Sequence, residues 1–389
     1  MPFTDPTVAL VHDYFVQDGG AEAVAVELSR MFPDAPIHTT FFERGRFGDR
    51  IDPRRIRSWR LQGLVGPSPW FRPLLPAYIA YFSTLQVRAS RLVISTSSTF
   101  ARGAAAGGET IHVAYIHTPM RFAWDVNGYL AGSSFPLPAR TGLRAIAPAL
   151  RRWDRWAGRR PDVLVANSRN VQRRIALRWG RESQVIHPPV DVSGVQPSAR
   201  DDGFYLVACR LLAYKRVDLA IEACARLGAE LVVVGDGPER ARLQAMAGSR
   251  TTFAGHVARS RLQELLGRCH ALIVPGIEDF GMTPVEAMAT GKPVIAFGAG
   301  GVLETIVDGQ TGVLFDRQDA RTLTDAITRL DSMSLDPAIA RVRALEFDVP
   351  VFHLRWGELL AELGLSGVLG PIAPAAHRGL DNALQAAMA

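Results

Sequence analysis

The sequence predicts an α/β protein of two Rossmann-like, doubly wound domains that face each other across a cleft. Three observations support this prediction. The chain has 389 residues, which is too long for one ordinary hydrophobic core. Short apolar runs alternate with segments of helical periodicity, as in parallel sheets covered by helices. The sequence contains no repeat of short period, which argues against a solenoid.

Eight apolar runs are expected to be buried parallel strands, four in each half of the chain. They are Val8–His12, Leu92–Thr96, Ile111–Ile116, Asp162–Ala166, Phe204–Cys209, Glu230–Val234, His270–Val274 and Pro293–Phe297. The helices expected between them include Ala21–Met31, Asn170–Trp179, Val217–Leu227 and Ser260–Cys269. Because such runs followed by helices form repeated βα units, each half should contain an open sheet.

The boundary between the two domains is expected within residues 188–202. Prolines, a glycine and several polar residues stand there between two apolar runs, as in a linker. This boundary gives a first domain of residues 1–195 and a second of residues 196–345, followed by a helical segment of residues 346–365. Residues 366–389 are rich in alanine, glycine and proline, so a disordered tail is expected.

Charge is distributed unevenly along the chain. Residues 1–195 carry 25 arginines and no lysine against 15 acidic residues, whereas residues 196–389 carry 19 basic and 23 acidic residues. The first half is therefore basic, which predicts contact with an anionic partner such as a membrane surface or a lipid pyrophosphate. A solvated basic face is the alternative. Nucleic-acid binding is not predicted, because no recognised motif accompanies the charge.

The sequence shows neither a secretory signal nor an apolar run of about 18 residues, so we expect a cytoplasmic protein, with peripheral contact at the inner face of the cell membrane as a further hypothesis. The segment 59–82 combines aromatic and basic residues, including Trp70, Phe71 and Arg72. This composition suits a membrane interface, or aromatic side chains that pack on the first sheet.

Two cations follow the first strand of the second half. Arg210 comes directly after this strand, and Lys215 stands just before a helix expected to begin near Val217. Fixed charge and free backbone N–H groups converge at such a place, which predicts an anion site that a pyrophosphate would fit. The alternative is a surface arginine and lysine at a helix start. Lysine is scarce here, because Lys292 is the chain's only other lysine.

Two acids eight residues apart follow the buried run His270–Val274. Between them, Gly281 would let the backbone approach a ligand closely, and Pro284 suits the first turn of a helix. We expect Glu286 in that first turn, facing the same cavity as Glu278. Carboxylates accept hydrogen bonds from hydroxyl groups, so one could hold a sugar and the other a ribose. Alternatively, Glu286 complements the helix dipole and Glu278 is exposed to solvent.

These motifs resemble the C-terminal domain of family 4 retaining glycosyltransferases, which have the GT-B fold. The resemblance covers about residues 204–316 densely, and two acids in an E-x7-E arrangement are the family's signature. It rests on Arg210, Lys215, the turn Gly235-Asp236-Gly237-Pro238, Gly255, Glu278-Asp-Phe-Gly, Glu286-Ala-Met-Ala-Thr-Gly-Lys-Pro-Val-Ile-Ala, Gly300-Gly301, Glu304-Thr305, Asp308-Gly309 and Thr311-Gly312. In this chain Pro275-Gly276-Ile277 replaces the Pro-Ser pair that many relatives carry before the first acid.

The first half is similar to the same family more loosely. Val11-His12-Asp13 and Gly19-Gly20-Ala21-Glu22 match its first strand and helix start, and residues 115–125 match a subgroup rich in mannosyltransferases that build cell-surface glycans. The resemblance implies that His117 faces the donor sugar at the reaction centre, although a histidine at a strand end is the alternative. Arg121 and Asp125 are candidate acceptor-binding residues, or an internal ion pair.

The resemblance implies a first domain that binds the acceptor, a second that binds the nucleotide sugar, and residues 346–365 packed back on the first. The implied catalytic residues are His117, Arg210, Lys215 and Glu278. The implied donor-binding residues are Gly19, Gly20, Gly235, Asp236, His256, Val257, Phe280, Gly281, Met282, Thr283 and Glu286. Gly235-Asp236-Gly237 lacks the full dinucleotide fingerprint, so no nicotinamide cofactor is expected.

The activity implied is transfer of a sugar with retention, preferably mannose from GDP-mannose, to a lipid-linked oligosaccharide or other glycan acceptor in cell-surface polysaccharide synthesis. No cofactor is expected, and divalent metal should be dispensable because the donor region has neither an Asp-x-Asp motif nor a His/Asp cluster. The alternatives are a transferase that uses a UDP-sugar and a small-molecule acceptor, a nucleotide-sugar epimerase or hydrolase, and a catalytically silent binding partner.

Overall fold

The computed structural model describes residues 6–60, 62–65, 74–130 and 136–369 and divides the chain into two compact units. Among the described residues, the first unit comprises those up to Trp124, Ile146–Pro189 and those from Phe352 onward, and the second comprises residues 125–130, 136–145 and Val190–Val351. The main division falls inside the expected linker. Residues 125–130 and 136–145, by contrast, were expected in the first domain and belong to the second unit. Within the described ranges, no helix is long and apolar enough to cross a membrane.

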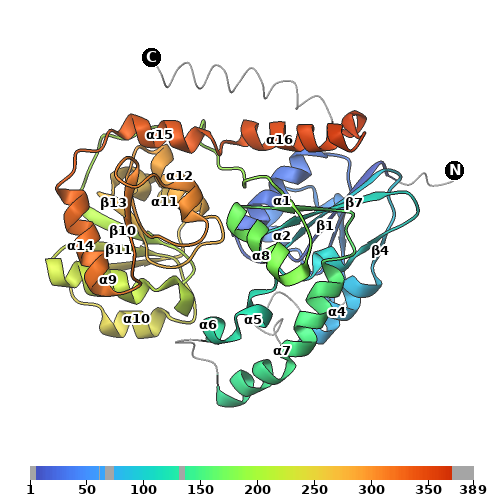
Figure 1. Ribbon diagram of the computed structural model, residues 1–389, viewed down its shortest axis with the longest axis horizontal. Coiled ribbons are helices and arrows are strands. Elements are labelled where there is room, and N and C mark those ends of the chain that lie inside the picture. The colour runs from blue at the N-terminus through green and yellow to red at the C-terminus, as the bar shows by residue number, and fades with distance from the viewer. Residues whose placement is uncertain (1–5, 61, 66–73, 131–135, 370–389) are drawn as a thin grey trace. The chain divides into compact units, whose positions relative to one another are not determined.

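A sheet that includes β1 and β7 forms the centre of the first unit (Figure 1). It has seven strands in the order β3-β2-β1-β5-β7-β8-β9. The strands are β1 (Val8–His12), β2 (Ile37–Thr39), β3 (Ile56–Ser58), β5 (Leu92–Ser97), β7 (Ile111–Ile116), β8 (Val163–Ala166) and β9 (Gln184–Val185). Each neighbouring pair is parallel, so all carboxyl ends lie at one edge. A separate parallel pair is formed by β4 (Gln86–Val87) and β6 (Ala105–Ala106).

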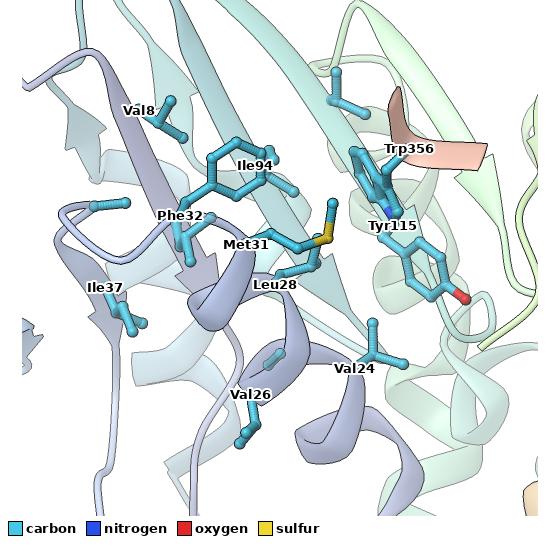
Figure 2. Packing of buried hydrophobic residues seen from close by; sticks show 14 of the residues in the cluster. Val8, Val24, Val26, Leu28, Met31, Phe32, Ile37, Ile94, Tyr115 and Trp356 are labelled. Atoms are coloured by element: carbon cyan, nitrogen blue, oxygen red, sulfur yellow. The ribbon is translucent and has the colours of Figure 1, made fainter. Parts of the chain in front are cut away.

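Eight helices lie wholly or mostly in the described part of the first unit. They are α1 (Gly20–Met31), α2 (Arg44–Phe47), α3 (Gln62–Val65), α4 (Leu75–Thr84), α5 (Arg121–Trp124), α8 (Arg169–Trp179), most of α7 (Leu137–Ala157) and most of α16 (Val349–Glu362). Figure 2 shows Trp356 of α16 beside Tyr115 of β7. Both rings are fully buried, and their centroids lie 6.3 Å apart. The late helix α16 therefore completes a core built by the first residues of the chain.

The second unit contains a six-stranded parallel sheet with the order β12-β11-β10-β13-β14-β15. Its strands are β10 (Phe204–Ala208), β11 (Glu230–Val234), β12 (Thr251–Gly255), β13 (Ala271–Val274), β14 (Val294–Phe297) and β15 (Gly312–Phe315). Its helices are α6 (Val126–Leu130), α9 (Val217–Leu227), α10 (Arg240–Met246), α11 (Arg259–Arg268), α12 (Met282–Ala289), α13 (Val302–Thr305), α14 (Ala320–Asp331) and α15 (Pro337–Leu345). Residues of α9 and α14 share one apolar cluster and those of α11, α12 and α15 another, so the sheet is doubly wound.

All eight expected strands are present, and their ends differ from the prediction by at most one residue. The same holds for the four helices named from the sequence. The strands β2, β3, β9, β12 and β15 were not predicted. Most of them lie at or near the edges of their sheets, and they are too short or too polar to form a continuous apolar run.

Two segments of uncertain role are partly described. In the aromatic segment 59–82, Tyr78 and Phe82 are buried, and the ring of Tyr78 stacks on that of Phe100 at 5.2 Å. These side chains therefore pack in the first unit, while Trp70, Phe71 and Arg72 lie outside the described residues. At the expected tail, Ser366–Val368 form a 3-10 turn, and residues 370–389 are not described.

Candidate functional site

Loops that follow neighbouring strands pack backbone against backbone at the carboxyl edge of the second sheet. A side chain on Gly300 would overlap the carbonyl oxygen of Glu278, and the first side-chain carbon on Gly276 would lie 2.7 Å from the Cα atom of Lys215. Glycine is the residue that permits such an approach. Gly276, the middle residue of Pro275-Gly276-Ile277, thus allows the loop after β13 to touch the turn after β10.

Lys215 and Glu278, which are 63 positions apart in sequence, form an ion pair at this edge. The Lys215 Nζ atom lies 2.5 Å from Oε1 and 2.6 Å from Oε2 of Glu278. Their side chains are 16% and 18% exposed, so both are largely shielded from water yet accessible. The pairing places a fixed cation and a hydrogen-bond acceptor side by side.

The environment keeps the Lys215 amine charged. Burial disfavours the charged form, but the adjacent Glu278 carboxylate outweighs burial and raises the pKa of Lys215 above its ordinary value. Lys215 is the last residue of the 3-10 turn Ala213–Lys215, and α6 packs against this turn. It is therefore a permanent cation at neutral pH, held on a packed turn.

The residue after Lys215 has an unusual backbone. Arg216 has a φ of 53°, the only positive φ of a non-glycine residue in the described part of the chain. It is the N-cap of α9, and its guanidinium lies 3.1 Å from the Asp218 carboxylate. Strained conformations of this kind persist where the surrounding structure fixes them. At Arg216 the chain turns sharply between the 3-10 turn that contains Lys215 and the start of α9.

Glu286 lies one turn later than expected. Because α12 begins at Met282, Glu286 is its fifth residue and falls in the second turn, so the first-turn placement was wrong. Its carboxylate lies 3.6 Å from the Arg259 guanidinium at the start of α11 and is 15% exposed. Glu286 thus complements a neighbouring arginine, and its place in a shared donor cavity with Glu278 stays a prediction.

The loop between the two acids is tightly folded. Gly281 has a φ of 96° and is the N-cap of α12, so the chain turns there through a conformation that favours glycine. The ring of Phe280 is buried edge-on against Phe347 at 5.4 Å, so this side chain belongs to the core of the second unit. Met282 and Thr283 are half-buried at the helix start.

The other implied donor residues of the second unit surround neighbouring strand ends. A side chain on Gly235 would overlap the carbonyl oxygen of Cys209, so the loops after β10 and β11 are in contact. Asp236 is exposed and pairs with Arg240 at 2.9 Å; its hydrogen bond from the Gly237 N–H helps to lower its pKa. Arg210 and His256 are exposed, and Val257 is half-buried.

His117 belongs to the first unit and directly follows β7. Its backbone N–H donates to the carbonyl oxygen of Ser97, and its ring, 8% exposed, lies edge-on to Tyr115 at 5.2 Å. Gly19 and Gly20 are at the carboxyl edge of the same sheet, where α1 begins. The role of His117 in catalysis stays a prediction.

A buried carboxylate, Asp13, holds the loop after β5. Its two oxygens accept hydrogen bonds from the backbone N–H groups of residues 98–101, at 2.6 to 2.8 Å. Nearby, Glu22 is 2% exposed with one oxygen buried and unpaired, and burial, followed by repulsion from Asp13 and Asp18, raises the pKa of Glu22 to about 8. A side chain on Gly19 would crowd this oxygen, at 2.8 Å.

The segment with the candidate acceptor residues is anchored by a second buried carboxylate. Asp154 pairs with Arg102 and accepts indole N–H bonds from Trp124 and Trp179 at 2.7 and 2.6 Å. Arg121 begins the short helix that ends at Trp124. Asp125 is exposed in the second unit, where it accepts from the Gly128 N–H.

The residues that the sequence did not reveal are mostly structural supports of these loops. Asp13 belonged to a quoted motif but had no assigned role, and Asp154 looked like one acid in an arginine-rich helix. The signal for Gly276 was present, because a glycine directly before the acid loop suggests close backbone approach. Lys292, the second lysine, donates to the carbonyl oxygen of Arg200 at 2.5 Å and so fixes the chain before β10.

Two protein-family models match consecutive parts of this chain. The model described as Glycosyl transferases group 1 matches residues 193–340, and the model described as Glycosyltransferase Family 4 matches residues 18–193. The chain belongs to the glycosyltransferases. The two matches meet at residue 193, close to the division between the units.

Curated relatives of this glycosyltransferase differ in name. A GDP-mannose-dependent alpha-mannosyltransferase of Mycolicibacterium smegmatis is 32% identical over 194 residues, which cover 45% of this chain and 50% of the relative. A glycogen synthase of Mycobacterium tuberculosis is 31% identical over 207 residues, which cover 49% of each. The chain spans about half the length of the curated relatives it matches.

Solved structures share the fold over nearly the whole glycosyltransferase chain. Anabaena HepE in complex with UDP and glucose gives a TM-score of 0.65 at 19% identity, covering 92% of this chain and 99% of HepE. Sucrose-phosphate synthase of Thermosynechococcus elongatus gives 0.64 at 20% identity, with the same coverage. At this identity the likeness establishes the GT-B type fold of two parallel-sheet α/β domains.

Proposed function

We propose that this glycosyltransferase transfers a sugar from a nucleotide-sugar donor with retention of the anomeric configuration. The Lys215–Glu278 pair is the observation that carries the proposal. An ammonium group has three donors and a carboxylate about four acceptor positions, so the pair has capacity left for a diphosphate and a sugar hydroxyl. In this proposal the second unit binds the donor and the first unit binds the acceptor.

The proposed reaction breaks the bond between the anomeric carbon and the diphosphate and forms one to an acceptor oxygen on the same face. The nucleoside diphosphate leaves with the electron pair, and its phosphate takes the acceptor proton. Negative charge grows on the leaving group, and the fixed cation of Lys215 stabilises it. Since this cation is already in place, we propose that divalent metal is dispensable, so activity should survive EDTA.

GDP-mannose is the proposed donor, and a lipid-linked oligosaccharide or other glycan is the proposed acceptor. The mannosyltransferase relative supports the donor, and the resemblance of the segment around His117 to mannosyltransferases supports both. The second candidate is a UDP-sugar with a small-molecule acceptor, which the HepE complexes with UDP and UDP-glucose favour.

A ligand screen with product analysis tests the proposal. Thermal unfolding should be recorded with GDP-mannose, UDP-glucose and GDP, because a ligand at a hundred times its Kd stabilises the folded state by about 2.7 kcal/mol. The largest rise in Tm is expected with GDP-mannose and should be lost in Glu278→Gln. An NMR spectrum of the product should then show a new α-glycosidic bond. No shift with any donor, or free sugar and nucleotide in the presence of acceptors, would contradict transferase activity.

A further inference from the structure

Two neighbouring helices of the first unit expose faces that carry arginine and no acid. In α7 the exposed residues Arg152, Arg155, Trp156 and Arg159 follow the spacing of one helix face and the turn after it. The only acid of α7 is Asp154, which is fully buried in its pair with Arg102. Its charge therefore does not offset the exposed arginines.

The second helix, α8, has the same character. It contains arginines at positions 169, 173, 174 and 178 and no acidic residue. The two helices are in direct contact, because the Arg155 Nε atom donates to the carbonyl oxygen of Arg178 at 3.3 Å, and both guanidinium groups lie over the ring of Trp124 at 5.0 and 5.5 Å. The two basic faces thus form one continuous region.

Large apolar side chains are exposed among these arginines. Within the described part of the first unit, the exposed large hydrophobic residues are Ile146, Trp156 and Leu177, and all three lie on α7 or α8. Leu177 is 86% exposed and Trp156 is 40% exposed. A single exposed leucine needs no explanation. Three exposed apolar side chains within a basic region whose only acid is buried do need one.

We propose that residues 146–159 and α8, here called the α7–α8 surface, dock on an anionic phospholipid bilayer. The proposal deepens the proposed function, since a lipid-linked acceptor would be met at that surface. Arginines would bind lipid phosphates bidentately, while Trp156, Ile146 and Leu177 would enter the interfacial layer. Charge complementarity identifies the anionic headgroups, and the apolar side chains identify a bilayer.

The apolar side chains also favour lipid over nucleic acid. A phosphate backbone would pair with the arginines, and a base could stack on Trp156, but the aliphatic side chains of Ile146 and Leu177 would gain little from either. In a bilayer the same side chains leave water. An amphipathic helix with arginine and tryptophan at its exposed face is the usual form of such a contact.

Vesicle co-sedimentation of the full chain tests the proposal. Vesicles of phosphatidylcholine alone should bind weakly, whereas vesicles with about one third phosphatidylglycerol should bind strongly and release the protein as salt is raised from 0.1 to 0.5 M. The variant Arg152→Glu with Arg159→Glu should reduce affinity at least about tenfold, because each basic residue near an anionic surface contributes about fivefold. The variant Trp156→Ser with Leu177→Ser should weaken binding at every salt concentration.

Controls separate the outcomes. Arg317→Glu with Arg321→Glu makes the same charge change on exposed arginines of the second unit and should leave vesicle binding unchanged. Equal loss in this control, or no loss in the α7–α8 variant, would overturn the proposal. Tighter binding to a single-stranded RNA than to the anionic vesicles would also overturn it, in favour of nucleic acid. The rise in Tm with GDP-mannose should persist in all three variants, so failure of docking is distinguishable from failure of the proposed function.

Discussion

The carboxyl edges of the two sheets are held in different ways. In the second unit, loops touch through backbone atoms, because glycines at 235, 276 and 300 leave no side chain between them. In the first unit, buried carboxylates hold the loops, with Asp13 binding four backbone N–H groups and Asp154 binding an arginine and two tryptophans. The second unit thus depends on close backbone packing, and the first unit on buried carboxylates that accept several hydrogen bonds.

This difference decides what a substitution does in each unit. Removing a charge from the second unit should leave its loops in place and affect mainly ligand binding, because backbone packing positions them. Removing a carboxylate from the first unit leaves buried donors without a partner and should affect folding. Loss of a charged side chain should therefore lower mainly stability in the first unit and mainly activity in the second.

The largest expected effect is at Asp154. Its replacement by alanine leaves the Arg102 guanidinium buried without its counter-ion and two indole N–H groups without an acceptor, which should cost about 3–5 kcal/mol of unfolding free energy. Urea unfolding measures this cost, with Glu182→Ala, an exposed acid of the same unit, as the control. A loss no larger than that of the control would show that the first unit is not held by its buried charge.

Lys215→Ala comes next and probes the other edge. Turnover should fall about 10²–10³-fold, as expected for loss of one group that stabilises a developing charge. Urea unfolding should change much less than in Asp154→Ala, because Gly276 and its neighbours keep the loops together. Lys215→Arg should recover part of the rate since it keeps the charge, and Arg210→Ala should lower turnover in the same direction. An unchanged kcat in Lys215→Ala would remove this residue from the mechanism.

Glu22→Gln should give the smallest effect, and one that depends on pH. The folded-state pKa of Glu22 is raised to about 8, whereas an unfolded glutamate titrates near 4.5, so the folded state holds an extra proton between these values. Stability contributed by this proton is lost as pH rises through that window. The variant should match the wild type at pH 4.5 and become progressively more stable than the wild type as pH rises toward 8.

Thermal unfolding across pH 4.5 to 9 measures the Glu22 effect. Glu109→Gln, which changes an exposed acid of the same unit, should shift the curve equally at all pH values. A difference between Glu22→Gln and wild type that does not grow with pH would show that the glutamate is ionised in the folded state.

Sequence reasoning was most successful where the physics is local. Buried parallel strands are continuous apolar runs, so all eight expected strands were found to within one residue, and the Lys215–Glu278 convergence follows from both groups standing after adjacent strands. The edge strands were missed because they are short and partly polar. Glu286 was misplaced by a turn because the helix start at Met282 has no side-chain cap to mark it.

Long-range polar contacts could not be predicted in the same way. Nothing near Asp154 in the sequence distinguishes it from a surface acid, since its partners Arg102, Trp124 and Trp179 are 52, 30 and 25 positions away. The pairing of Glu286 with Arg259 likewise depends on how α11 and α12 pack. Contacts of this kind are decided by tertiary structure, after the strands and helices have been placed.

The position of α16 has a consequence for synthesis on the ribosome. Phe352 and Trp356 fill the core of the first unit, yet they are translated after all of residues 190–351, which belong to the second unit. The nascent first unit therefore lacks these two core side chains when it emerges. All six strands of the second sheet, by contrast, are translated before Phe352. The core of the first unit can therefore be completed only after residues 190–351 have been translated.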